Sequence, residues 1–311
     1  MLVLEKRRGV RMGWSEKLME SLDRGAEVLD TDRGPVQFAR EGQGPPVLVV
    51  HGGPGGYDQG LGLGRHFVDA GCEVLAPSRP GYLRTPLESG RSPEEQADLY
   101  AALLTALQID QVAVLGVSSG GPSAVHFAAR HPEMTSALML DVAVLRPFPV
   151  ATSRINEMLF GSSLGVRLVC QLATKRPQAM AAIIVDSFSA GYDKQQKKDA
   201  TEWIRSNPTR LRQAGELATS LAPREFRAPG QANDEATEPE LPPLPFDKVT
   251  APTLIATGTN DGIVPVEHST NAANQIEGAE IMLIDGAHHG LSLSPNYAPL
   301  AQRQIELTLG A

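Results

Sequence analysis

The expected fold is decided by the stretch Val112-Ala-Val-Leu-Gly-Val-Ser-Ser-Gly-Gly-Pro122. Its apolar start predicts a buried strand, and a helix pattern follows its end. Glycines two residues on either side of Ser118 allow the strand and helix backbones to approach closely, as in the Gly-x-Ser-x-Gly nucleophile elbow. We therefore expect Ser118 to be a nucleophile. Ser119 is the weaker candidate, because Val117 would occupy its preceding small-residue position.

Apolar, β-branched runs like this one recur along the chain, and helix patterns separate them. They cover residues 46–50, 72–76, 137–144, 253–256 and 280–284. Near-continuous apolar strands that alternate with helices are typical of a parallel sheet covered on both faces. We therefore predict an α/β fold with a mostly parallel central sheet flanked by helices. Residues 26–40 predict a hairpin at its edge.

The pattern changes after residue 146. From residue 153 to residue 221, helix patterns follow one another without a good strand, which predicts an inserted helical cap over the strand ends, where ligands bind in open α/β sheets. The proline-rich segment 222–246 predicts an extended return linker. The expected divisions are a leader (1–25), a first core part (26–146), the cap with its linker (147–246) and a second core part (247–311).

The composition excludes several classes of protein. The chain has 311 residues and a formal net charge of -8, which argues against nucleic acid or an anionic membrane as a partner. It has no apolar run long enough for a bilayer span or a secretory signal, and Cys72 and Cys170 are expected to be free thiols, so we expect a cytoplasmic protein. No metal-ligand spacing occurs, and we expect no cofactor. The oligomeric state stays open, a homodimer included.

A second glycine-rich turn, His51-Gly-Gly-Pro-Gly-Gly56, follows the predicted strand 46–50. It lacks the Lys-Ser/Thr ending of a phosphate-binding loop and the register of a dinucleotide-binding turn. The alternative is an oxyanion hole, in which two backbone N–H groups stabilise the negative charge that acyl transfer creates. We expect the N–H groups of Gly53 and Ser119 to form it, and His51 to be structural.

A serine nucleophile needs a base and an acid, and both follow later strands in the order serine, acid, histidine. Asp261 lies in a polar turn after strand 253–256, and His288 and His289 follow the last predicted strand. Asp141 is a rival acid within another predicted strand. Asp261 is preferred because it lies in a polar turn that follows a strand, as the acid should. Asp285 is expected only to shape the histidine turn.

These motifs resemble the α/β-hydrolase superfamily, in the capped branch of esterases and proline iminopeptidases, over roughly residues 26–146 and 247–311. The family's oxyanion strand, its elbow and its acid loop match Val49–Gly53, Gly116–Gly120 and Gly258–Pro265. Its histidine turn aligns without a gap on Ile284–His289. The resemblance therefore implies His289 as the base and leaves His288 as the alternative.

The implied function is a cofactor-free serine hydrolase that cleaves a small-molecule ester or related acyl substrate through Ser118, Asp261 and His289. An aminopeptidase is an alternative, because His51–Gly55 resembles proline iminopeptidases, although the elbow and the loop 78–81 depart from their pattern. Carbon–carbon bond hydrolysis, acyl transfer and a non-catalytic or slow ligand receptor on the same fold are further alternatives.

Overall fold

The computed structural model describes residues 13–149 and 161–310. These residues form an eight-stranded sheet in the order β1-β2-β4-β3-β5-β6-β7-β8. Strand β2 pairs antiparallel with both of its neighbours, β1 and β4, and all other neighbouring strands pair parallel. The bounds are β1 Glu27–Thr31, β2 Gly34–Gly42, β3 Pro46–Val50, β4 Glu73–Pro77, β5 Val112–Val117, β6 Thr135–Asp141, β7 Thr253–Gly258 and β8 Glu280–Ile284. The predicted α/β fold and its edge hairpin are confirmed.

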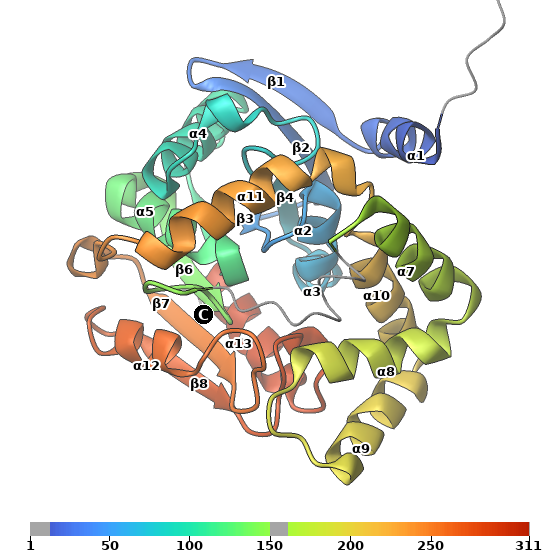
Figure 1. Ribbon diagram of the computed structural model, residues 1–311. Coiled ribbons are helices and arrows are strands. Elements are labelled where there is room, and N and C mark those ends of the chain that lie inside the picture. Colours follow the sequence, from blue (N-terminus) through green and yellow to red (C-terminus); the bar gives the residue numbers. More distant parts are fainter. Residues whose placement is uncertain (1–12, 150–160, 311) are drawn as a thin grey trace, which may run out of the picture.

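Helices cover both faces of the sheet (Figure 1). Successive side chains of a strand point to opposite faces, so Leu48 and Val50 enter one apolar core while Val47 and Val49 enter the other. The first core packs against α4 Pro93–Ala106 and α5 Gly121–Arg130, near α12 Glu267–Ala273. The second packs against α2 Tyr57–Leu63, α3 Arg65–Asp69 and α13 Tyr297–Leu309, and the short α1 Trp14–Asp23 contributes Met19.

Helices α2 and α3 meet at Gly64, which ends the first and precedes the second. A Cβ atom at Gly64 would lie 2.9 Å from the side chain of Val74 in β4. The chain therefore turns at a residue whose lack of a side chain lets it lie this close to the sheet.

The cap lies between β6 and β7, as predicted. Its described helices are α7 Ser163–Lys175, α8 Pro177–Phe188, α9 Lys194–Arg205, α10 Pro208–Thr219 and α11 Ala228–Thr237. Helices α7 to α10 gather at one side of the molecule, and α11 runs back across the strand ends (Figure 1). The start of the predicted helical region, residues 153–160, lies outside the described residues.

The prediction of an extended linker over 222–246 is wrong, because helix α11 occupies the middle of this segment. Pro229 lies in the first turn of α11, where a helix needs no backbone donor; Pro223 precedes the helix, and the remaining prolines of the segment follow it. The helix is also held by buried ion pairs that composition cannot reveal.

Two absences concern only residues 13–149 and 161–310. No helix there is both long and apolar enough to cross a bilayer. The same residues contain no cluster of three or more His, Cys, Asp or Glu side chains that could hold a metal ion.

Candidate active site

Ser118 stands on the sharp turn between β5 and α5. Its φ angle is 51°, a left-handed conformation that costs free energy for a residue other than glycine and is typical of functional turns. A Cβ atom at Gly116 would lie 2.5 Å from Cβ of Ala124, and one at Gly120 would lie 2.4 Å from the carbonyl oxygen of Val50. The two glycines therefore permit the turn, for the reason expected from the sequence.

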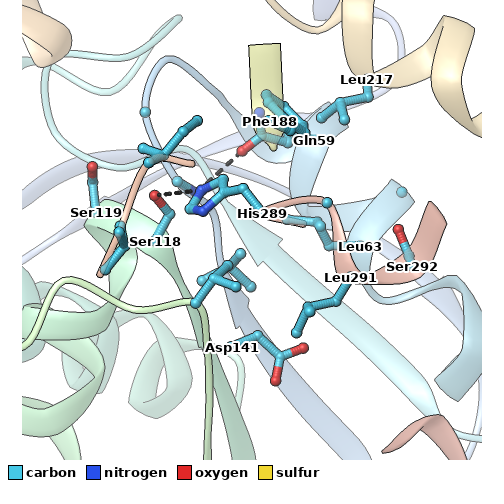
Figure 2. Close-up of a pocket in the computed structure, with 18 of the residues that line it drawn as sticks. Gln59, Leu63, Ser118, Ser119, Asp141, Phe188, Leu217, His289, Leu291 and Ser292 are labelled. Atoms are coloured by element: carbon cyan, nitrogen blue, oxygen red, sulfur yellow. Dashed lines mark hydrogen bonds between the residues drawn. The ribbon is translucent and has the colours of Figure 1, made fainter. Parts of the chain in front are cut away.

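His289 lies between Ser118 and Asp261. Its Nε2 atom is 3.2 Å from Oγ of Ser118, and its Nδ1 atom is 2.8 Å from Oδ2 of Asp261 (Figure 2 draws the first contact). The side chain of Asp261 is buried, and its Oδ1 atom accepts hydrogen bonds from the N–H groups of Ile263 and Val264 at 2.8 and 2.9 Å. These donors stabilise a carboxylate and fix its orientation toward His289.

His288 points elsewhere. It is buried, and its Nδ1 atom accepts a hydrogen bond from the N–H of Gly290 at 3.0 Å. Burial lowers the pKa of His288 to about 4, so the ring is neutral at pH 7. Of the two histidines left open by the sequence, the structure brings only His289 to Ser118.

Asp141, the rival acid, is separate from this chain of hydrogen bonds (Figure 2). It is buried at the end of β6, where Nε2 of Gln304 donates to it at 2.9 Å. Burial raises the pKa of Asp141 to about 7. Asp285 accepts a long hydrogen bond, 3.4 Å, from the hydroxyl of Thr259 in the neighbouring turn.

The loop after β3 lies against the elbow. A Cβ atom at Gly52 would be 2.9 Å from Cβ of Ser118. In the described part of the chain, the N–H groups of Gly53 and Ser119 have no hydrogen-bond partner, so both are free to donate to a ligand. His51 is buried; its Nδ1 donates to the carbonyl of Gly52 at 2.7 Å, and its Nε2 accepts from the N–H of Arg79 at 2.9 Å. It holds the loop, as expected.

The end of cap helix α8 contacts both the acid and the histidine turns, which the sequence analysis missed. The carbonyl oxygen of Phe188 accepts hydrogen bonds from the N–H groups of Gly262 (2.9 Å) and His289 (3.1 Å). The Phe188 ring meets the His289 ring edge-on at 5.6 Å. The cap therefore helps to position both turns. No local sequence signal marks this contact.

Helix α11 anchors the cap to the core with two buried arginine–carboxylate pairs. Arg227, fully buried, binds Asp58 through two hydrogen bonds and donates to the carbonyl of Gly55 at 2.6 Å. Asp234 accepts two hydrogen bonds from Arg79, at 2.7 and 2.9 Å, and one from the Tyr82 hydroxyl at 2.6 Å. Arg227 thus fixes the glycine loop at Gly55, and Asp234 fixes the neighbouring loop that holds Arg79 and Tyr82. The sequence signalled these ion pairs only through the isolated charged residues in the proline-rich segment 222–246.

A cavity of about 220 Å³ opens above Ser118. Most of its wall is apolar, and the core and the cap both contribute aromatic and aliphatic residues, among them Leu63, Leu115, Phe148, Phe188, Leu217, Leu291 and Leu293. Its carboxylates are Asp58, Asp141, Glu216 and Glu238. A mostly apolar cavity with few polar groups is typical of a small-molecule site.

Comparison with known proteins gives a family match over most of the chain. Residues 45–295 match the model of the alpha/beta hydrolase fold family. An alpha/beta hydrolase fold protein from Nakamurella multipartita has a solved structure that superimposes with a TM-score of 0.88; it is 36% identical, and the match covers 92% of this chain and 100% of that chain.

Two curated relatives are more distant. The uncharacterized hydrolase YcgS of Bacillus subtilis (strain 168) is 28% identical over 86% of this chain and 93% of its own length. The 2-hydroxy-6-oxo-6-phenylhexa-2,4-dienoate hydrolase of Burkholderia cepacia is 25% identical over 80% of this chain and 82% of its own length.

Proposed function

Because the chain belongs to the alpha/beta hydrolase fold family, we propose that it is a serine hydrolase that cleaves a small ester or a related acyl compound. The observation that carries the proposal is the continuous hydrogen-bonded series Ser118–His289–Asp261 beside two N–H groups, of Gly53 and Ser119, that have no partner among the described residues. A serine hydroxyl alone is a poor nucleophile; a neighbouring imidazole that a carboxylate orients makes it an effective one.

The proposed reaction has two halves. Nε2 of His289 takes the proton of the Ser118 hydroxyl as Oγ attacks the substrate carbonyl carbon. The resulting oxyanion accepts hydrogen bonds from the N–H groups of Gly53 and Ser119, and Asp261 stabilises the imidazolium. When the intermediate collapses, the alcohol leaves with the proton from His289, and an acyl-enzyme remains.

Water completes the cycle. His289 takes a proton from a water molecule, which attacks the acyl carbon, and the same proton then returns to Oγ of Ser118 as the acid is released. Nothing in this sequence of steps needs a cofactor. The substrate is proposed to be a small molecule, since the cavity is about 220 Å³.

The test is active-site labelling combined with turnover. A fluorophosphonate should label the protein stoichiometrically at Ser118, and Ser118→Ala should abolish labelling and lower kcat/KM for phenyl butanoate by at least about 10⁴-fold. A matched Ser119→Ala variant keeps the backbone N–H and should still be labelled. Absence of labelling in the native protein would favour the receptor alternative. Faster cleavage of a matched anilide than of the phenyl ester would favour the aminopeptidase alternative.

A further inference from the structure

Glu238 is a buried acid that the proposed reaction does not use. It directly follows α11 and lines the cavity together with Ser118 and Ser119. Only 5% of the residue is exposed, and its Oε1 atom has no hydrogen-bond partner among the described residues. Buried polar atoms in native proteins are nearly always paired, so an unpaired oxygen in a cavity wall indicates a missing ligand group.

Asp234, the acid four residues earlier in α11, differs from Glu238 in how its carboxylate is paired. Both carboxylate oxygens of Asp234 are held by Arg79, and one also accepts from Tyr82. Among the described residues, the side chain of Ser119 is the one hydrogen-bonding neighbour of the Glu238 carboxyl group. Asp234 is therefore a structural anchor, whereas Glu238 keeps an oxygen available beside the residue that is proposed to supply an oxyanion donor.

The charge of the cavity wall is one-sided. Four carboxylates line it, and no lysine or arginine is among the described lining residues. Asp58 is paired with Arg227 and Glu216 lies 3.6 Å from Arg212, while Asp141 accepts a hydrogen bond from the uncharged side chain of Gln304. A substrate with a carboxylate, such as the dienoate in the name of the Burkholderia relative, would meet like charge here without a partner.

We propose that Glu238 binds a positively charged nitrogen of the substrate, so that the preferred substrate is an ester whose acyl part carries an amine near the scissile carbonyl. This rests on the proposed serine-hydrolase function. The ammonium group would supply the missing donor to Oε1 in a charge-assisted hydrogen bond. The ring of Phe148, whose backbone N–H donates to the Glu238 carbonyl at 2.9 Å, lines the same cavity and suits a cation or the alkyl chain that carries it.

The titration of Glu238 provides a second test of the proposal. Burial raises its pKa to about 7; the facing charges of Asp234 and Glu235 also raise the pKa, and Arg79 lowers it. Below this pH the carboxyl is neutral and loses its attraction for a cation. Because kcat/KM reports the free enzyme, the preference for an amine should decline as the pH falls below about 7.

The experiment compares three phenyl esters of similar size: β-alaninate (cationic), butanoate (neutral) and hemisuccinate (anionic). At pH 8, we expect the native protein to prefer β-alaninate over butanoate in kcat/KM by about tenfold, the contribution of one charge-assisted hydrogen bond. Hemisuccinate should be the poorest of the three. Glu238→Gln should abolish the preference for β-alaninate while hydrolysis of butanoate continues.

Matched variants distinguish the effect of the Glu238 charge from the effect of the overall charge of the cavity wall. Glu216→Gln removes an exposed carboxylate of the same cavity and should leave the preference unchanged. Glu238→Asp keeps the charge and should keep part of the preference, which supplies an answer if Glu238→Gln does not fold. Equal rates for β-alaninate and butanoate in the native protein, or a preference that survives Glu238→Gln, would overturn the proposal.

Binding to Ser118→Ala separates this proposal from the hydrolase function. Calorimetry with the same esters needs no turnover, and β-alaninate should bind about tenfold more tightly than butanoate only while Glu238 is present. Failure of native hydrolysis together with this binding preference would contradict the hydrolase function and support the subsite. Hydrolysis of butanoate without any preference would do the reverse.

Discussion

Two adjacent histidines differ in every contact that matters for the proposed chemistry. The His289 ring connects Ser118 to Asp261, whereas the His288 ring is turned into the protein and accepts from the N–H of Gly290. The backbone at this turn points consecutive side chains in different directions. Position in the sequence therefore decides much less than the direction in which each ring leaves the backbone.

The two histidines should give opposite results when they are replaced. His289→Gln is expected to lower kcat by about 10³–10⁴-fold, because the general base is lost. His288→Asn is expected to keep most of the activity and to lower the free energy of unfolding by about 1–2 kcal/mol, since it changes a buried side chain. Phenyl butanoate hydrolysis and urea unfolding would measure both effects, and the prediction is wrong if His288→Asn is the less active variant.

Asp141 should make stability depend on pH in a specific direction. Its pKa is about 7 in the folded protein but near 3.8 in an unfolded chain, so between these pH values the folded state binds the additional proton. Stability from this group is present below about pH 4 and is lost as the pH rises through 7.

Asp141→Asn removes this titration and keeps an acceptor for Gln304. Its free energy of unfolding should rise relative to that of the native protein from pH 5 to pH 8, by about 2–3 kcal/mol. Urea unfolding at the two pH values measures the difference. A difference that does not change with pH would show that Asp141 does not titrate in this range.

At the scale of elements, the junction of β5 and α5 depends on the absence of side chains. A Cβ atom at Gly120 would meet two backbone carbonyl oxygens, at 2.4 Å (Val50) and 2.7 Å (His51). Backbone cannot move aside as the end of a flexible side chain can, so β3, the glycine loop and the elbow would have to separate.

Gly120→Ala should therefore lower the free energy of unfolding by about 1–3 kcal/mol, as overpacking does, and should also reduce fluorophosphonate labelling. Gly215 in α10 is the matched control, since its Cβ would have its nearest neighbour at 4.0 Å. Gly215→Ala should raise stability by about 0.5–1 kcal/mol through helix propensity. Equal effects of the two substitutions in urea unfolding would contradict the packing explanation.

At the scale of the whole molecule, the cap and the core are joined by buried charge. Arg227 on the cap side and Asp58 in α2 are 169 residues apart in the chain, and the arginine also holds the glycine loop through Gly55. Removal of one partner leaves the other charge buried and uncompensated, which is why such pairs are sensitive to truncation.

Arg227→Met should lower the free energy of unfolding by about 3–5 kcal/mol. The control is Arg303→Met at the surface, where the Arg303–Glu280 pair is 34% and 45% exposed and should contribute little to stability. Urea unfolding of both variants measures the two losses of stability. Similar small losses would mean that the cap does not depend on this ion pair.

The sequence by itself determined the sheet, the elbow, the cap's place between β6 and β7, and the small set of residues from which the site is built. These depend on local requirements: apolar runs for covered strands, and glycines where backbones meet around Ser118. Strand order then brings the ends of β5, β7 and β8 to one edge, which is why Asp261 and both histidines could be named in advance.

Only the tertiary structure decided which histidine faces Ser118, that 228–237 is a helix, that Phe188 supports the histidine turn, and that Glu238 has an unpartnered oxygen in the cavity. Each of these depends on partners far away in the chain. Composition records how many prolines and charges a segment has, but a helix is stabilised mainly by its tertiary contacts, and a side chain's role depends on where its ring or carboxylate points.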